Sequence, residues 1–293
     1  MAQAFEWPRE PLGQKHDGYT EFIVRPFRSS HAALGVALLV GSALVATAFI
    51  GSAGASGARA RYPIGIANSK EPSGFAPPGL RALPGYRRTY VQDFKGAGSL
   101  KGWGLFNGVP GGDPTGHFSP GHVQVFQGLL RLKSFRDPLF HDFWVTGGLC
   151  QCSRPAAYGA YFVRSRVTAA GTNSVELLWP ANNVWPPEVD FNEDLFHVNL
   201  TTATVHWSNS TDFHILKINM LRWHTWGIIW TPTYILDVVD GTAWHEVSRR
   251  SAVPHVPMVL DLEQRTSCTS LLPCPGQSSS MLIDWVAEYR SKR

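Results

Sequence analysis

Three carboxylates stand close together in the stretch WPPEVDFNED, and such a group can do nucleophilic or acid–base chemistry: Glu188, Asp190 and Glu193. Apolar residues alternate with the acids, so the segment predicts a strand whose successive side chains point to opposite faces. Glu188 and Asp190 then share a face, whereas Glu193 lies an odd number of positions further on. A β-bulge near Asn192 would add one residue to the strand and return Glu193 to the shared face.

Carboxylates at close range repel one another, so one keeps its proton while another is ionised. A retaining glycosidase needs such a pair, a carboxylate nucleophile and a carboxylic acid about 5–5.5 Å apart. Trp179 and Trp185 flank the acids and could supply flat walls for sugar rings. Core packing is the alternative for Trp179, whereas Trp185 stands beside two prolines, which indicates the rim of a cleft.

The elements that must position these residues read as strands. After residue 90, short alternating runs are separated by turn residues, and no stretch has a helical period. Gln-Gly within HVQVFQGLLRLKSF and Asp-Gly within TYILDVVDGTAWHEV predict two hairpins. About two hundred residues of this pattern without internal repeats predict an all-β fold with one β-sandwich.

The N-terminal third has a different composition. Residues 32–50 carry no charge and approach the length of about 20 residues that crosses a bilayer as a helix. They predict a transmembrane signal anchor over residues 32–51 after a short cytoplasmic tail, residues 1–31; a cleaved signal peptide is the alternative. Residues 52–89 are basic and rich in proline and glycine, which predicts a disordered linker before a folded domain of residues 90–293. The domain would be extracytoplasmic and membrane-anchored, or secreted.

Charge and cysteines narrow the possible functions. The formal net charge is +4, and the basic excess lies in the linker, so nucleic-acid binding has no support. All four cysteines follow the apolar run and so lie where disulfides persist. A Cys150–Cys152 bond would close a very tight ring, so we expect Cys268 to pair with Cys274 alone, or the two clusters to pair with each other. A zinc site is the rival, but the C-x-C and C-x5-C spacings lack the usual C-x2-C element.

The stretch EVDFNE resembles the E-x-D-x-x-E signature of glycoside hydrolase family 16, the laminarinase-like β-glucanases. Further blocks resemble that family in the same order, and are most similar to its actinobacterial members: TGGLCQC, YGAYFVRSRV, LLWP, HW, WHTWGIIWTP, VDG and IDWVAEYR. The resemblance covers about residues 90–290 and implies a concanavalin A-like jelly-roll sandwich for the catalytic domain.

The resemblance also implies roles for individual residues. Glu188 would be the nucleophile, Glu193 the general acid and base, and Asp190 the group that holds and tunes them. His206, Asn107 and Gln264 are further candidates for the substrate-binding site, with a structural role as the alternative for each. Some relatives bind a structural calcium ion, for which this sequence shows no distinctive ligand cluster, and no other metal or cofactor is expected.

The function that follows from the resemblance is hydrolysis of a β-linked polysaccharide by a double displacement. We expect an endo-β-1,3-glucanase that acts as a monomer. The same three acids occur in family members with other substrates, so two alternatives stay open. One is a transglycosylase that remodels envelope polysaccharide, and the other is a carbohydrate-binding protein that has lost turnover.

Overall fold

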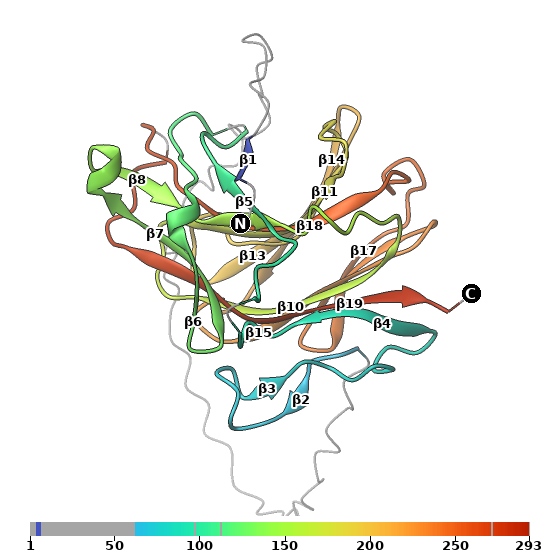
Figure 1. Cartoon of the computed structure of the whole chain (residues 1–293). Helices are drawn as coiled ribbons and strands as arrows, with labels where there is room; N and C mark the ends of the chain where they lie inside the picture. Colours follow the sequence, from blue (N-terminus) through green and yellow to red (C-terminus); the bar gives the residue numbers. More distant parts are fainter. Residues whose placement is uncertain (1–3, 7–61, 97, 112, 271, 293) are drawn as a thin grey trace, which may run out of the picture. The chain divides into compact units, whose positions relative to one another are not determined.

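The computed structural model describes residues 4–6 and 62–292, apart from residues 97, 112 and 271. Regular structure in this part of the chain is almost entirely β, with two short 3-10 helices, η1 (Pro120–His122) and η2 (Pro138–Phe140). Two sheets lie one above the other and form a sandwich (Figure 1). The all-β sandwich that the sequence predicts is therefore confirmed.

The upper sheet in Figure 1 has eight strands and carries the three acids. Its strands are antiparallel except for β1, which runs parallel to β5. In spatial order they are β1 (Ala4–Glu6), β5 (Gly104–Asn107), β9 (Gly148–Cys150), β18 (Met258–Arg265), β11 (Asn173–Pro180), β12 (Glu188–Glu193), β13 (Leu200–Trp207) and β14 (Ser210–Lys217).

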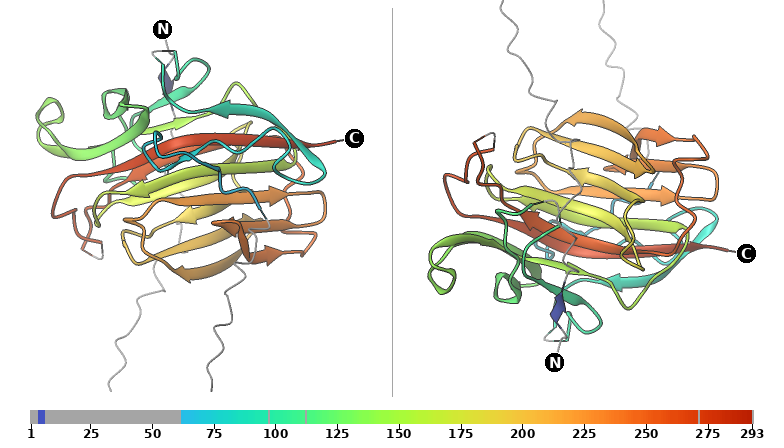
Figure 2. Two further views of the ribbon diagram at one scale, coloured as in Figure 1. Left: turned by 90° about the horizontal axis from the view of Figure 1, so that it is seen from below. Right: turned by 90° about the horizontal axis from the view of Figure 1, so that it is seen from above.

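The second sheet has nine strands and supports the first from below, as the two views of Figure 2 show. The main path runs through β17 (Thr242–Val247), β16 (Ile235–Val239), β15 (His224–Trp230), β10 (Gly159–Val167), β19 (Ser279–Ser291), β7 (Leu129–Asp137) and β6 (Val123–Phe126). Two further strands pair at its side, β4 (Tyr86–Gln92) with β19 and β8 (Phe143–Thr146) with β7.

Both predicted hairpins are present. Strands β6 and β7 are joined by Gln127 and Gly128, with φ angles of 53° and 73°. Strands β16 and β17 are joined by Asp240 and Gly241, with φ angles of 45° and 79°. Positive φ at both central residues matches the twist of the flanking strands, which explains the Asx-Gly and Gln-Gly pairs at these turns.

The core lies between the sheets and is filled by alternate residues of the strands. From the eight-stranded sheet, Val189, Phe191 and Leu260 point into it, and from the nine-stranded sheet Trp226 and Trp230 do so. Each of these side chains is at most 1% exposed. This packing fixes the face of β12 that points away from the core, which is the face of the acids.

The expected linker over residues 52–89 is wrong from residue 62 onward. Residues 66–67 and 75–76 form a small sheet of their own, β2 (Ile66–Ala67) and β3 (Phe75–Ala76), and Leu83 is only 4% exposed. The reason is that the outer face of the nine-stranded sheet is also apolar. Leu83 packs there against a cluster that includes Phe162 and Trp285, and so covers surface that would otherwise meet water.

The predicted tail and anchor lie outside the described residues, except that residues 4–6 form β1. None of the helices in the described part of the chain has the length and hydropathy that a bilayer span requires. The pairing of β1 with β5 and a membrane span at residues 32–50 exclude one another, because the span would place residues 4–6 and the domain on opposite sides.

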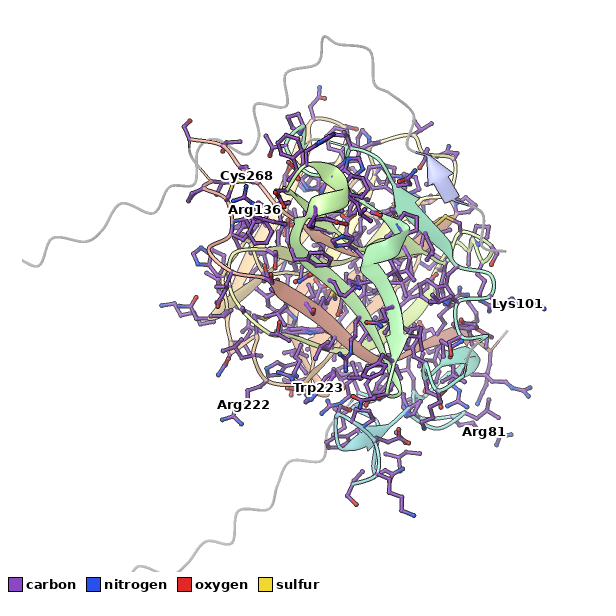
Figure 3. All side chains as sticks on the ribbon, turned by 60° about the vertical axis from the view of Figure 1, so that its left-hand side comes forward. Arg81, Lys101, Arg136, Arg222, Trp223 and Cys268 are labelled. Carbon is purple, nitrogen blue, oxygen red and sulfur yellow. A yellow bond between two sulfur atoms is a disulfide. The ribbon has the colours of Figure 1, made fainter. Side chains whose placement is uncertain are left out.

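Both cysteine pairs bond within themselves, Cys150 to Cys152 and Cys268 to Cys274. The first bond corrects the expectation that its ring is too tight, since the two Cα atoms lie 5.0 Å apart, within the usual range. The chain turns at Cys152 directly after β9, which brings the side chains together. The second bond confirms the predicted pairing of Cys268 with Cys274 but not that this pair forms alone, and Cys268 lies at the periphery of the sandwich (Figure 3).

Candidate active site

The bulge that the sequence predicts is present in β12. On the β13 side the register steps from Asp190–Thr204 directly to Glu193–Thr202, two positions on β13 against three on β12. Thr204 and Thr202 are alternate residues of β13 and so point to the same face of the sheet. Their partners Asp190 and Glu193 therefore point to that face as well. Glu188 lies two positions before Asp190 and shares the face. All three acids therefore lie on the outward face of the eight-stranded sheet.

The residues inside the bulge anchor it from below. Phe191 is fully buried between the sheets, and Asn192 is 1% exposed. The hydroxyl of Thr201 donates to Oδ1 of Asn192 at 2.6 Å and accepts from the backbone N–H of Glu193 at 3.0 Å. One side chain of β13 thus satisfies both an amide oxygen and the N–H of the third acid, and this fixes the irregular stretch.

Removing this hydroxyl is expected to destabilise the bulge. Thr201→Val would leave the Glu193 N–H and the Asn192 oxygen buried without this partner, at a cost of about 1–3 kcal/mol in the free energy of unfolding. Thr201→Ser keeps the hydroxyl and is the matched control. Thermal unfolding of both variants measures the difference, and equal midpoints for the valine and serine variants would contradict an anchoring role.

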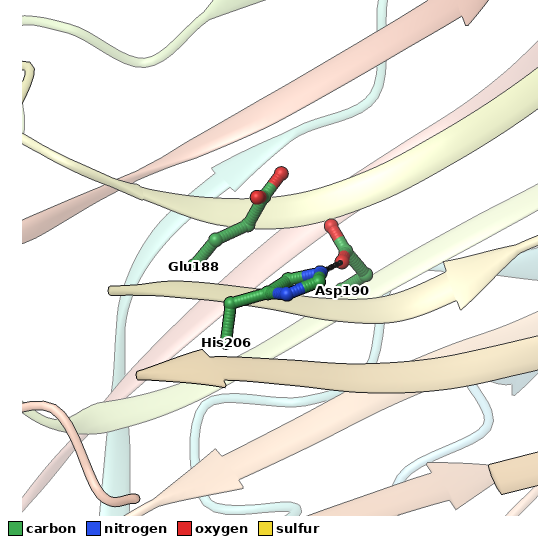
Figure 4. Close-up of side chains that lie close together, drawn as sticks. All are labelled: Glu188, Asp190 and His206. Atoms are coloured by element: carbon green, nitrogen blue, oxygen red, sulfur yellow. Dashed lines mark ion pairs between the residues drawn. The ribbon is translucent and has the colours of Figure 1, made fainter. Parts of the chain in front are cut away.

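Glu188 lies at the open end of the row of acids. Its Oε2 accepts a hydrogen bond from Nε1 of Trp185 at 2.8 Å, and that indole is 37% exposed. The ring of Trp185 is tilted over the ring of His206, with centroids 5.9 Å apart. Nε2 of His206 lies 3.9 Å from Oδ2 of Asp190, as the close-up of Figure 4 shows. The arrangement places an exposed indole and an imidazole beside Glu188, and the role of Trp185 at the rim of a cleft stays a prediction.

The other two acids are buried, and burial is the main cause of their shifted pKa values. Glu193 is 5% exposed, and desolvation raises its pKa. A hydrogen bond from Nδ2 of Asn173 at 2.7 Å acts in the opposite direction, while the charge of Glu188 raises the pKa of Glu193 further. Desolvation, followed by the charges of Glu188 and Glu193, also raises the pKa of Asp190. Such a site favours a protonated Glu193 beside its neighbours.

Two further predicted residues lie in different environments. Trp179 is half-buried on β11, where its Nε1 donates to Oδ1 of Asn183 at 2.8 Å. Asn107 ends β5, and three strands separate β5 from β12, so a contact of Asn107 with sugar stays a prediction.

The prediction that Gln264 contacts the sugar is wrong. Its side chain is fully buried and lies within hydrogen-bonding distance of the hydroxyls of Thr172 and Ser174. Gln264 stands between Glu263 and Arg265 on β18, and side chains alternate along a strand. Glu263 and Arg265 point to the outward face, so Gln264 points into the sandwich. Its polar atoms are used to connect strands, and this explains why a glutamine is tolerated there.

The described residues contain one cluster whose ligand atoms could hold a metal ion. Oxygens of Glu188 and Asp190 and a ring nitrogen of His206 all lie within 4.8 Å of one another. These side chains belong to the row of acids itself, so a cation there would compete with any chemistry of Glu188. The expectation of a metal-free mechanism is kept as a prediction.

Sequence reasoning missed two further carboxylates on this face, Asp261 and Glu263 of β18. Strand β11 lies between β18 and β12, and its Leu177 is opposite Asp261 on one side and Asp190 on the other. Burial raises the pKa of Glu263 to about 7, and the charges of Glu188 and Glu193 contribute. The alternating acids of PMVLDLEQR were the available signal, but only the strand order brings them beside β12.

Solved structures of glycoside hydrolases share this fold. The laminarinase from Rhodothermus marinus has 18% identity and a TM-score of 0.65, and the match covers 72% of this chain and 100% of that one. The laminarinase catalytic domain from Thermotoga maritima gives 17% identity and a TM-score of 0.62 over 71% and 99% of the two chains. The endo-β-1,3-glucanase from Pyrococcus furiosus has 20% identity and a TM-score of 0.60, and the match covers 71% of this chain and 95% of that one.

Sequence comparison identifies the family. Among curated proteins, none matches the chain. The sequence model described as glycosyl hydrolases family 16 matches residues 115–270, which include the row of acids on β12 and most of the eight-stranded sheet. Because this match spans more than half of the chain, and the sandwich and the bulged acidic strand accompany it, the chain belongs to family 16 of the glycosyl hydrolases.

Proposed function

We propose that the protein is a retaining glycoside hydrolase that cleaves β-linked polysaccharide, specifically an endo-β-1,3-glucanase. The observation that carries this proposal is the bulge of β12, which brings Glu193 to the face of Glu188 and Asp190. The structural neighbours named laminarinase or endo-β-1,3-glucanase support the choice of linkage.

In the first step, a carboxylate oxygen of Glu188 forms a bond to the anomeric carbon while the glycosidic C–O bond breaks. Glu193 gives its proton to the leaving oxygen, so the departing sugar leaves as a neutral alcohol. In the second step, the Glu193 carboxylate takes a proton from water, whose oxygen attacks the anomeric carbon and releases Glu188. Two inversions at the same carbon keep the β configuration.

Charge explains how Glu193 acts as an acid and then as a base. Burial and the charge of Glu188 both raise the pKa of Glu193 in the free enzyme, which keeps the proton needed for the first step. When Glu188 becomes a glycosyl ester, its charge disappears and the pKa of Glu193 falls. Asp190, between the two in the row, would hold their positions, and Trp185 would support the sugar ring next to Glu188.

Two measurements on the full chain test the proposal. Release of reducing sugar is compared across laminarin, lichenan, agarose, galactan and envelope polysaccharides, and proton NMR during early hydrolysis identifies the first anomer. We expect turnover on laminarin and a β product at first. An initial α product would overturn the double displacement, and product chains longer than the donor would identify a transglycosylase instead.

The pH dependence should respond to Arg265. This guanidinium lowers the pKa of Glu193 and of Asp190, so Arg265→Gln removes a charge that favours their ionised forms. Glu193 would then keep its proton to higher pH, and the basic limb of kcat/KM should move up by a few tenths to about one pH unit. Arg265→Lys keeps the charge and should leave the basic limb of kcat/KM near its original pH. An unmoved basic limb in Arg265→Gln would contradict the assignment of Glu193 as the general acid.

We also propose that residues 32–50 anchor the protein, with a monomeric extracytoplasmic domain; secretion after cleavage is the alternative. In the anchored protein residues 4–6 would lie on the cytoplasmic side, so β1 would not pair with β5 there. The length of the uncharged run supports the anchor. Cell fractionation should find the full-length protein in the membrane. Mature protein that begins near Arg59 or Arg61 by N-terminal sequencing, or full-length protein in the soluble fraction, would contradict the anchor.

A further inference from the structure

Strand β14 forms one edge of the eight-stranded sheet in the described part of the chain, and it carries two exposed apolar side chains. Phe213 is 36% exposed and Ile215 is 49% exposed. Single apolar residues are common on protein surfaces, so exposure alone carries little meaning. The face of the sheet to which these two side chains point is informative, because only one face carries the three acids.

The residues that alternate with them identify that face. They are Asp212 and His214. Oδ1 of Asp212 lies 2.8 Å from Nε2 of His245, and the ring of His214 stacks on the ring of His245 with centroids 5.0 Å apart. His245 belongs to β17 of the other sheet, so Asp212 and His214 point toward that sheet. Side chains alternate along a strand, and Phe213 and Ile215 therefore point to the outward face.

The register of the sheet connects this surface to the acids. Phe213 pairs with Thr204 of β13, which pairs in turn with Asp190 of β12. One row further along, Ile215 is connected to Glu193 through β13 in the same way. Neighbouring strands lie about 4.8 Å apart, so Phe213 is about 10 Å across the sheet from the acids. One β-linked sugar unit lengthens a glucan by a distance close to one strand spacing, so a ring over Phe213 is roughly two units from the cleaved bond.

Apolar surface is also present on the opposite side of the acids. Leu177 of β11 pairs with Asp190, and Trp179 lies two positions further on, so Trp179 points to the outward face too. Trp179 and Phe106 line a cavity of about 210 Å³ there. The acids thus lie between two apolar surfaces of one sheet face. A chain that contacts both surfaces crosses the strands, as cleavage within a long chain requires.

We propose that Phe213, with Ile215 beside it, binds a sugar ring of the glucan roughly two units from the cleaved bond. The phenyl ring offers a flat apolar face to the C–H face of the sugar, and Ile215 extends this surface along β14. This inference rests on the proposed function, since it names a specificity-determining residue of the same enzyme. Its consequence is a preference for long chains over short ones.

The test compares kcat/KM of the full chain and of Phe213→Ala on β-1,3-linked glucose oligomers of increasing length and on an aryl β-glucoside. One sugar with its aryl group covers β12 and does not reach β14. We expect the alanine variant to lose about 10-fold on the octamer, because the contact with the phenyl ring is lost, and to stay within about 2-fold of the parent on the aryl glucoside. The positions at which a labelled hexamer is cut should also shift.

Two variants serve as controls. Phe213→Trp keeps an aromatic face and should retain the preference for long chains. Phe126→Ala removes a phenylalanine that is 46% exposed on β6 of the other sheet, and should behave like the parent. An unchanged rate of Phe213→Ala on the octamer, or an equal loss on the octamer and the aryl glucoside, would overturn the inference. A parent dimer that Phe213→Ala dissociates in sedimentation would also overturn it, since a second copy would then cover the edge strand.

The outcomes separate this inference from the proposed function. Hydrolysis of laminarin with retention, together with a dependence on chain length that Phe213→Ala does not change, would sink the inference and leave the enzyme assignment standing. Calorimetry with the same oligomers covers the other case. Affinity that rises with chain length and falls in Phe213→Ala, without hydrolysis of any polysaccharide by the parent chain, would support the binding surface and reject the hydrolase.

Discussion

Replacing Glu188 by glutamine is expected to reduce turnover of polysaccharide by about 10⁴-fold or more, while the protein stays folded and still binds oligosaccharide. The amide of glutamine has the same size as the carboxylate but is a very poor nucleophile towards the anomeric carbon. The variant therefore loses the first chemical step itself, although the side chain keeps its position. Binding should persist because Trp185 remains beside residue 188, where the amide oxygen of a glutamine can accept the same hydrogen bond. Initial rates and calorimetry on the same preparation provide both numbers.

The thermal stability of Glu188→Gln distinguishes a loss of turnover from misfolding. The charge of Glu188 raises the pKa values of Asp190, Glu193, Asp261 and Glu263, which means that these groups repel one another. Glu188→Gln should therefore leave the unfolding midpoint at neutral pH unchanged or higher. Glu246→Gln, a surface change of the same type, should keep full activity. Substantial turnover by Glu188→Gln would remove Glu188 from the role of nucleophile.

Glu193→Ala is expected to separate substrates by their leaving groups. On polysaccharide, the leaving oxygen needs a proton, and activity should fall by about 10²–10⁴-fold. On aryl glycosides whose phenolate leaves without protonation, the first step should stay within about 10-fold of the parent rate, and the glycosyl ester should accumulate because no base activates water. A burst of released phenol followed by a slow steady rate measures both effects.

The matched control is Glu193→Gln, which keeps the side-chain volume and the hydrogen bond from Asn173. If the alanine and glutamine variants lose activity equally on both classes of substrate, the residue has a structural role and not an acid–base one. An equal loss would also mean that the bulge has no catalytic role, since the bulge contributes to catalysis only by bringing Glu193 to the face of Glu188.

Much of the fold and the centre of the site could be predicted because the information is local. The Gln127-Gly128 and Asp240-Gly241 turns each show in two letters of sequence, and the odd step from Asp190 to Glu193 required a bulge once all three acids were placed on one face. These features depend on the period of a strand and on backbone conformation. Neither requires knowledge of which strands are neighbours.

The features that could not be predicted depend on strand order and on both faces of a sheet. Asp261 reaches the site only because β18 lies next to β11, and the sequence does not contain that adjacency in any short stretch. Leu83 looked like part of a linker, because its partners Phe162 and Trp285 lie far along the chain on a sheet that is apolar on its outer face. Gln264 was misassigned for the same reason, since its partners are on other strands.

Strand β19 has a consequence for how this domain is made. It follows every other described strand in the chain, yet it lies in the middle of the nine-stranded sheet between β10 and β7. Arg290 of β19 donates to the hydroxyl of Tyr161, 129 residues earlier. The ribosome therefore delivers this strand after its neighbours, and until then β10 and β7 lack their shared partner. Sheets with such distant pairing close slowly, on the order of milliseconds to seconds, so the two halves of the nine-stranded sheet stay unpaired until β19 joins them.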